Sequence, residues 1–86
     1  MKSAGHTVTL IHRTTKERRE LQAVGSPASV YLAIRWPLAG WYYLDLRKNR
    51  LKISKWSRET LDWSCEDIDA ARKYAWSLRR SSKDLL

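Results

Sequence analysis

The sequence predicts an α+β fold: a small antiparallel β-sheet, made of a three-stranded meander and an N-terminal hairpin, with one C-terminal amphipathic helix packed on one face. Two patterns predict it. Apolar and polar residues alternate over 29–36, 41–47 and 50–56, which is the period of a half-buried strand. After Ser64 the apolar residues recur every three to four positions, which is the period of a helix.

Length and composition indicate one small domain. Eighty-six residues suffice for a single core, and 43% hydrophobic with 30% charged residues lies in the globular range. We expect 1–86 to form one domain that is ordered over about 7–78, with loose polar ends at 1–6 and 80–86.

The first two predicted strands form the N-terminal hairpin. Residues 7–12 are β-branched and apolar, with Val8 and Leu10 on one side. The polar segment 14–17 is predicted as a turn. Residues 18–24 alternate only weakly and would also suit a helical turn, but a strand that closes the hairpin is favoured.

The meander follows a break around Pro27. The strict period of two over 29–36 favours a strand over a short helix capped by Ser26. Residues 41–47 form the clearest strand, and 50–56 pair back to it after a two-residue Lys-Asn connection. The predicted inward face consists of Val30, Leu32, Ile34, Tyr42, Leu44, Leu46, Leu51 and Ile53.

A C-terminal helix completes the predicted fold. Ser64 is its predicted N-cap, and Asp67 is the acidic partner of a capping box. The connector before the helix is predicted to pack Leu61 and Trp63 against the core. The apolar stripe that faces the sheet consists of Ile68, Ala71, Tyr74, Ala75 and Leu78.

The charge balance points to an anionic partner. Seventeen Lys and Arg against nine Asp and Glu give a formal net charge of +8, which is enough on a small surface to attract anions. Nucleic acid, either DNA or RNA, is the commonest such partner, and acidic protein surfaces follow. We expect no membrane partner and no small-molecule substrate. The oligomeric state stays open, although an exposed edge strand at 7–12 would allow pairing with a second copy.

The predicted contact surface is the sheet face that the helix leaves open. There, aromatic rings alternate with cations, and Asp45 is the only acid. Cations neutralise phosphates, and exposed rings stack on bases. The predicted contact residues are Tyr31, Arg35, Trp41, Tyr43, Arg47, Arg50, Lys52 and Trp56. A purely structural interpretation competes, because rings also pack across strands beneath Arg and Lys stems.

Two functions fit this face. The first is a small basic nucleic-acid-binding domain. The alternative is a non-enzymatic protein-interaction module, such as a phage or mobile-element protein that docks on and inhibits a host nucleic-acid-processing or defence complex. Trp, Tyr and Arg also dominate protein–protein hot spots, so the residue types suit either partner.

No enzyme, cofactor or metal is predicted. His6 and His12 have no Ser, Cys or carboxylate partner at an informative spacing, and Cys65, expected in the first helical turn, lacks a base. One Cys and two distant His are too few for a metal site. Glycine-rich phosphate loops and the RNP, KH and zinc-finger signatures are absent from the sequence.

The expected location is the cytoplasm. A single cysteine excludes an internal disulfide and suits a reducing compartment. No apolar run approaches the roughly 20 residues of a membrane span, and the first residues lack the apolar stretch of a signal peptide.

Overall fold

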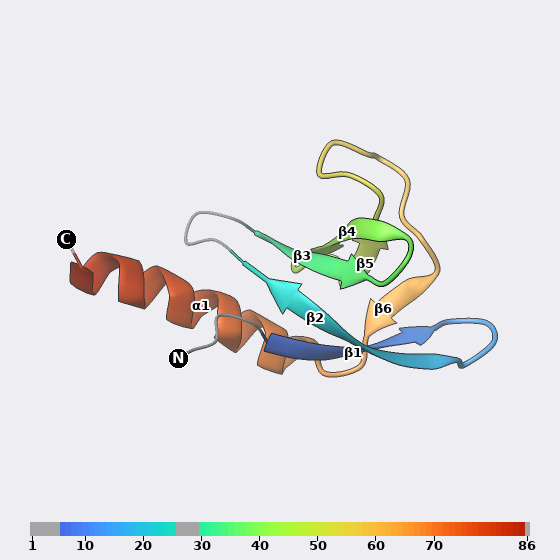
Figure 1. The fold of residues 1–86 in the computed structure, drawn as a ribbon, viewed down its shortest axis with the longest axis horizontal. Helices are drawn as coiled ribbons and strands as arrows, with labels where there is room; N and C mark the ends of the chain where they lie inside the picture. Colours follow the sequence, from blue (N-terminus) through green and yellow to red (C-terminus); the bar gives the residue numbers. More distant parts are fainter. Residues whose placement is uncertain (1–5, 26–29, 86) are drawn as a thin grey trace.

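The computed structural model describes residues 6–25 and 30–85, with side chains described as far as Leu78. These residues form six antiparallel strands and one C-terminal helix (Figure 1), so the α+β class is confirmed. The elements are β1 (His6–His12), β2 (Arg18–Val24), β3 (Tyr31–Trp36), β4 (Gly40–Asp45), β5 (Arg50–Lys52), β6 (Trp63–Cys65) and α1 (Ile68–Leu85). Of the predicted loose ends, residues 1–5 and Leu86 lie outside the described residues. In the predicted C-terminal loose end, the backbone is helical as far as Leu85.

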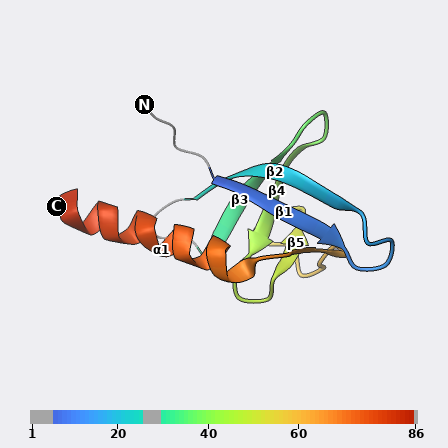
Figure 2. The same ribbon diagram turned by 90° about the horizontal axis from the view of Figure 1, so that it is seen from below.

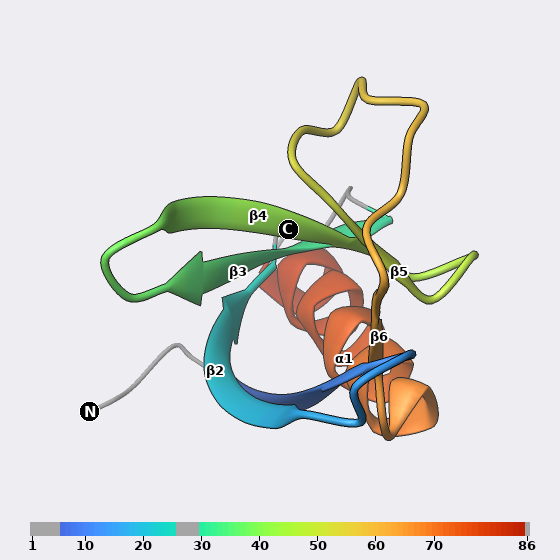
Figure 3. The same ribbon diagram turned by 90° about the vertical axis from the view of Figure 1, so that its right-hand side faces the viewer.

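The strands form one sheet in the order β5-β4-β3-β2-β1-β6, and the sheet curls into a nearly closed barrel (Figure 3). The two end strands, β5 and β6, contact each other, and in the segment just before β6 the Leu61 amide donates to the Leu51 carbonyl of β5 at 2.7 Å. The Asn49 side chain joins the same seam: its Nδ2 donates to the Cys65 carbonyl at 3.1 Å, and its Oδ1 accepts from the Cys65 amide at 2.8 Å. A side-chain amide therefore supplies the hydrogen bonds that a further strand residue would make.

The prediction understated the sheet by one strand. Residues 63–65 pair with the end of β1, with Leu10 opposite Cys65. A three-residue strand is too short to show a period in sequence, so its partner alone defines it. The predicted edge at 7–12 is consequently flanked by β2 on one side and, near its end, by β6 on the other.

The helix begins later than predicted. Ser64 lies in β6, so it is not the N-cap, and Asp67 takes that position. The Asp67 Oδ1 accepts a hydrogen bond from the Ala70 amide at 3.1 Å, which satisfies one of the free amides of the first turn. Pairing with β1 holds 63–65 extended and moves the helix start to Ile68.

Two predicted strands are also shorter than expected. The strand predicted at 41–47 ends at Asp45, and a four-residue turn replaces the predicted two-residue connection. Asn49 closes that turn in the left-handed conformation, with φ of 55°, as its residue type allows. The strand predicted at 50–56 ends at Lys52, and Ile53, predicted to face inward, is 61% exposed on the following loop.

The core lies inside the barrel, and α1 crosses one of its ends (Figure 2). At this end Gly25 leaves room for the helix, since a Cβ there would lie 2.8 Å from both Leu32 Cδ2 and Leu78 Cδ1. The predicted helix stripe is confirmed, with Ala71 and Ala75 buried. The buried apolar residues are Val8, Leu10, Leu21, Ala23, Leu32, Ile34, Leu44, Leu46, Leu51, Cys65, Ala71 and Ala75.

Aromatic rings cover the opposite end of the barrel. The Trp36 ring meets Tyr42 and Trp63 edge to face, at 5.6 and 5.1 Å between centroids. The His12 ring contacts Trp63 in the same way at 5.1 Å, and the Arg19 guanidinium lies 5.6 Å from the centroid of Trp36. Trp63 and Leu61 pack against the core, as predicted. These contacts fix the end of β3 and hence the direction of the β3–β4 hairpin.

Candidate nucleic-acid interface

The outer surface of β3, β4 and β5 carries most of the predicted contact residues. Arg35 lies directly across from Trp41, and Tyr43 lies across from Lys52. Tyr31 shares this face because it stands two pairs away from Arg35 on β3. The strand register therefore puts these five residues on one surface, the outside of the barrel, opposite the core residues Leu32, Ile34 and Leu44.

The structure changes the role of Lys52. Its side chain is 6% exposed, and its Nζ donates to the Lys55 carbonyl at 3.3 Å while lying 5.2 Å from the ring centroid of Tyr31. The sequence places Lys52 on the outer face but cannot show that the loop after β5 folds back over it. Lys52 and the half-buried Tyr31 therefore pack beneath the exposed residues of the face, and Lys52 is not an accessible cation.

Aromatic side chains on β4 form the accessible middle of the face. Trp41 is 49% exposed, which leaves part of its ring open for stacking. The Lys55 ammonium lies 5.7 Å from the ring centroid of the half-buried Tyr43. A cation over one ring and an open ring beside it combine charge with a flat apolar surface.

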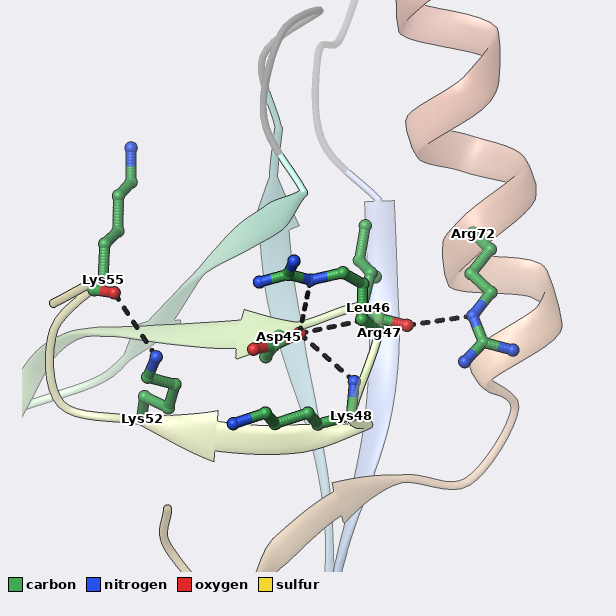
Figure 4. A network of polar contacts seen from close by, with 7 residues as sticks. All are labelled: Asp45, Leu46, Arg47, Lys48, Lys52, Lys55 and Arg72. Atoms are coloured by element: carbon green, nitrogen blue, oxygen red, sulfur yellow. Dashed lines mark hydrogen bonds and ion pairs between the residues drawn. The ribbon is translucent and has the colours of Figure 1, made fainter. Parts of the chain in front are cut away.

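Asp45, predicted to be the only acid on the face, is buried and is not exposed on that face. The residue is 1% exposed, and its Oδ1 accepts hydrogen bonds from the amides of Arg47 and Lys48 at 2.9 and 3.2 Å (Figure 4). The Arg47 Nε lies 3.8 Å from the same oxygen. Because strand β4 ends at Asp45, Arg47 stands on the β4–β5 turn, exposed and beside α1, and not on the strand face where it was predicted.

The other two predicted residues flank the face. Arg50 lies across from Asp45 at the start of β5, half-buried, with its guanidinium donating to the Asn49 carbonyl at 3.0 Å. Trp56 is 87% exposed, but it belongs to the loop between β5 and β6 and not to a strand. Figures 1 and 3 show this loop rising on the outer side of β4 and β5, away from the helix.

The net positive charge of the sequence concentrates in the segment that contains β3, β4, β5 and part of the loop that follows β5. Residues 30–58 contain seven Lys and Arg and a single acid, which is a net charge of +6 out of the total of +8. The described side chains form four ion pairs, and Arg47 is the one cation of this segment that takes part. Accessible cations without an ion pair in this part of the described structure are Arg35, Lys48, Lys55 and Arg58.

Sequence reasoning missed Lys55, Arg58 and Leu38. The first two lie on the β5–β6 loop beside the exposed Trp56. The serines at 54 and 57 signal that a strand ends there, since serine favours turns, and this signal could have moved both cations into a loop. Leu38 is fully exposed at the tip of the β3–β4 hairpin, where composition alone predicted only a turn.

The possible catalytic residues have structural contacts. The Nδ1 atom of His12 accepts from the amides of Thr14 and Thr15, both at 3.2 Å, and the His6 ring stacks on Tyr74 at 4.7 Å. Burial raises the pKa of the Cys65 thiol, and the carboxylates of the adjacent acidic residues act in the same direction, outweighing a backbone hydrogen bond that lowers it. Cys65 lies in β6, so the predicted placement in the first helical turn is wrong.

Neither metal binding nor a resemblance to a known protein indicates what the described residues do. Within 6–25 and 30–85, no group of three or more His, Cys, Asp or Glu side chains is placed to hold a metal ion. None of the helical residues described there forms a segment long and apolar enough to cross a membrane. No protein-family model, curated protein or solved structure matches the chain.

Proposed function

We propose that this protein is a non-enzymatic, cytoplasmic nucleic-acid-binding domain, and that its contact surface is the outer face of β3, β4 and β5 with the loop at 53–58. The observation that carries the proposal is a set of exposed cations, Arg35, Lys55 and Arg58, that form no ion pair among the described residues. They share this surface with the exposed rings of Trp41 and Trp56, while Asp45 is buried. Phosphate neutralisation and ring stacking are the two interactions that sequence-tolerant nucleic-acid binding requires.

Each group has a defined role in the proposal. Arg35, Lys55 and Arg58 contact phosphates, because their side chains are exposed and carry no ion pair among the described residues. Trp41 and Trp56 offer rings to bases, each stacked base contributing about 1–3 kcal/mol. Lys52 and Tyr31 hold the face rigid through their cation–π contact.

Fluorescence anisotropy with labelled single-stranded DNA, duplex DNA and RNA tests the proposal. We expect binding that weakens with salt, with a log–log slope of about −0.7 to −0.9 for each phosphate neutralised. Replacing Arg35 or Lys55 with Gln should lower the magnitude of that slope by about 1. Lys16→Gln is the matched control, since Lys16 is an exposed cation in the β1–β2 turn. Absence of binding to all three probes at low salt would contradict the proposal.

A second candidate function is a protein-interaction module, such as an accessory protein that inhibits a host nucleic-acid-processing or defence complex. A different surface favours it: a concavity of about 490 Å³ lies between α1 and the end of β4. Apolar atoms of Leu46 and Trp76 line it, and Arg47, Arg72 and Lys73 surround them. Exposed Trp and Arg side chains are typical of protein–protein hot spots.

A pull-down with and without nuclease separates the two candidates. Nucleic-acid binding predicts that co-purifying proteins disappear after nuclease treatment and that Trp41→Ala reduces recovery. The protein-interaction candidate predicts a stoichiometric complex that survives nuclease and is lost in Trp76→Ala, because Trp76 is 66% exposed at the concavity.

A further inference from the structure

The tip of the β3–β4 hairpin presents an apolar side chain in an unfavourable backbone conformation. Leu38 has φ of 69°, and the Ala39 amide donates to the Trp36 carbonyl at 2.9 Å, which is typical of a type II turn that begins Trp36-Pro37. The third position of such a turn favours Gly or Asn, because a side chain with a Cβ is strained there. The chain nonetheless places a fully exposed leucine at this point.

The hairpin is built to hold this tip in place. Trp36 is anchored by its ring contacts with Tyr42 and Trp63, and the residue after it is Pro37, whose ring fixes φ. Trp36 also pairs with Gly40 across the base of the turn. Figures 2 and 3 show the β3–β4 connection projecting beyond the rest of the barrel. Leucine and proline therefore form a rigid apolar projection.

The surroundings of the tip suit a polyanion. Arg35 and Trp41 lie across from each other one pair below the turn, and they share with Pro37 and Leu38 a concavity of about 540 Å³. The sequence contains no Asp or Glu between Glu20 and Asp45, and Asp45 is buried at the end of β4 that lies away from the turn, so no exposed acid of β3 or β4 opposes a phosphate at the tip. An apolar projection beside a cation is the combination with which proteins wedge apart stacked base pairs.

We propose that Leu38, supported by Pro37, inserts between neighbouring base pairs of duplex DNA from the minor groove, while Arg35 contacts the flanking phosphates. The proposal rests on nucleic-acid binding as proposed above and adds the form of the ligand, a stacked double helix that is locally unstacked and bent. Flexible pyrimidine–purine steps are the expected insertion points, since they unstack most easily.

The test uses the full chain and a duplex that carries 2-aminopurine at a central TA step, whose fluorescence increases when the base loses its stacking. Anisotropy of an end label on the same duplex reports binding independently. We expect the wild-type protein to raise the 2-aminopurine signal in parallel with binding. Leu38→Asn should bind with an unchanged salt slope and lose the increase, while its melting temperature stays equal or rises because Asn tolerates positive φ.

Ile53→Asn is the matched control, since Ile53 is an exposed aliphatic residue on another loop, and it should keep the 2-aminopurine increase. Binding of duplex DNA by the wild type without an increase, or an equal increase with Leu38→Asn, would overturn the wedge and leave nucleic-acid binding intact. Binding confined to single strands or RNA would also overturn the wedge. A flat anisotropy with every nucleic acid would overturn both proposals.

Discussion

Asn49 combines a backbone conformation and a pair of hydrogen bonds that other residue types do not provide together. Its φ of 55° closes the β4–β5 turn, and its side chain bonds both the amide and the carbonyl of Cys65. Glycine adopts the same φ but has no side chain. The contribution of the two hydrogen bonds can therefore be measured separately from that of the turn.

Asn49→Gly should lower the free energy of unfolding by about 2–4 kcal/mol, because it leaves two polar groups of Cys65 unsatisfied. Urea denaturation followed by tryptophan fluorescence measures the change. Lys16→Gly is the control, since Lys16 has φ of 65° in an exposed turn, and relief of that strain should leave stability equal or slightly higher. A loss of only a few tenths of a kcal/mol in Asn49→Gly would argue against a seam held by this side chain.

Cys65 should make stability depend on alkaline pH. Its pKa is raised in the folded state by burial, so above the unfolded thiol value of about 8.5 the unfolded chain releases its proton first. The free energy of unfolding should consequently fall as pH increases from there through the folded pKa. Cys65→Ala or Cys65→Ser should lose this component of the pH dependence, and a thiol reagent should label native Cys65 far more slowly than the unfolded chain.

At the residue scale, side-chain direction was predictable and accessibility was not. The period of two put Arg35, Trp41 and Tyr43 on the outer face, as the strand register has them. The burial of Lys52 depends on the path of the following loop, which no local pattern encodes. Asp45, predicted on the surface, is likewise buried at the end of β4, where it accepts hydrogen bonds from backbone amides two and three positions later.

At the element scale, the start of α1 is a point where sequence and structure assign different caps. Asp67→Ala should cost about 0.5–2 kcal/mol, since Asp67 accepts from the Ala70 amide. Ser64→Ala should change stability by less than about 0.5 kcal/mol, because Ser64 lies in β6. Chemical denaturation of both variants checks the assignment, and a larger effect at Ser64 would restore the cap expected from sequence.

The elements that sequence predicted share a property that β6 lacks. Strands β1 to β4 have six or seven residues each, enough for alternation or β-branched composition to be visible. Helix α1 shows its stripe over several turns. The three residues of β6 form a strand because they pair with β1. The capping-box pattern, which is typical of a helix start, overlaps the same residues. Tertiary pairing overrides the local signal here.

For the whole molecule, the uneven distribution of charge should make the fold more stable in salt. The +6 of residues 30–58 repels itself, and about 500 mM NaCl screens that repulsion far more than about 50 mM does. We expect a gain of about 0.5–1 kcal/mol over this range, a rise of about 2–8 °C in melting temperature. Differential scanning calorimetry measures it, and the double variant Arg35→Gln/Lys55→Gln should respond less. A falling melting temperature would contradict this expectation.

The pairing of β1 with β6 also has a consequence for the nascent chain. Roughly fifty residues separate the end of β1 at His12 from Trp63, and at about 5–20 residues per second the ribosome needs about 3–10 seconds to add them. During that time the side of β1 that receives β6 has no partner, and unpaired strand edges of this kind promote aggregation. The speed at which the middle of the message is translated thus determines how long this edge stays open.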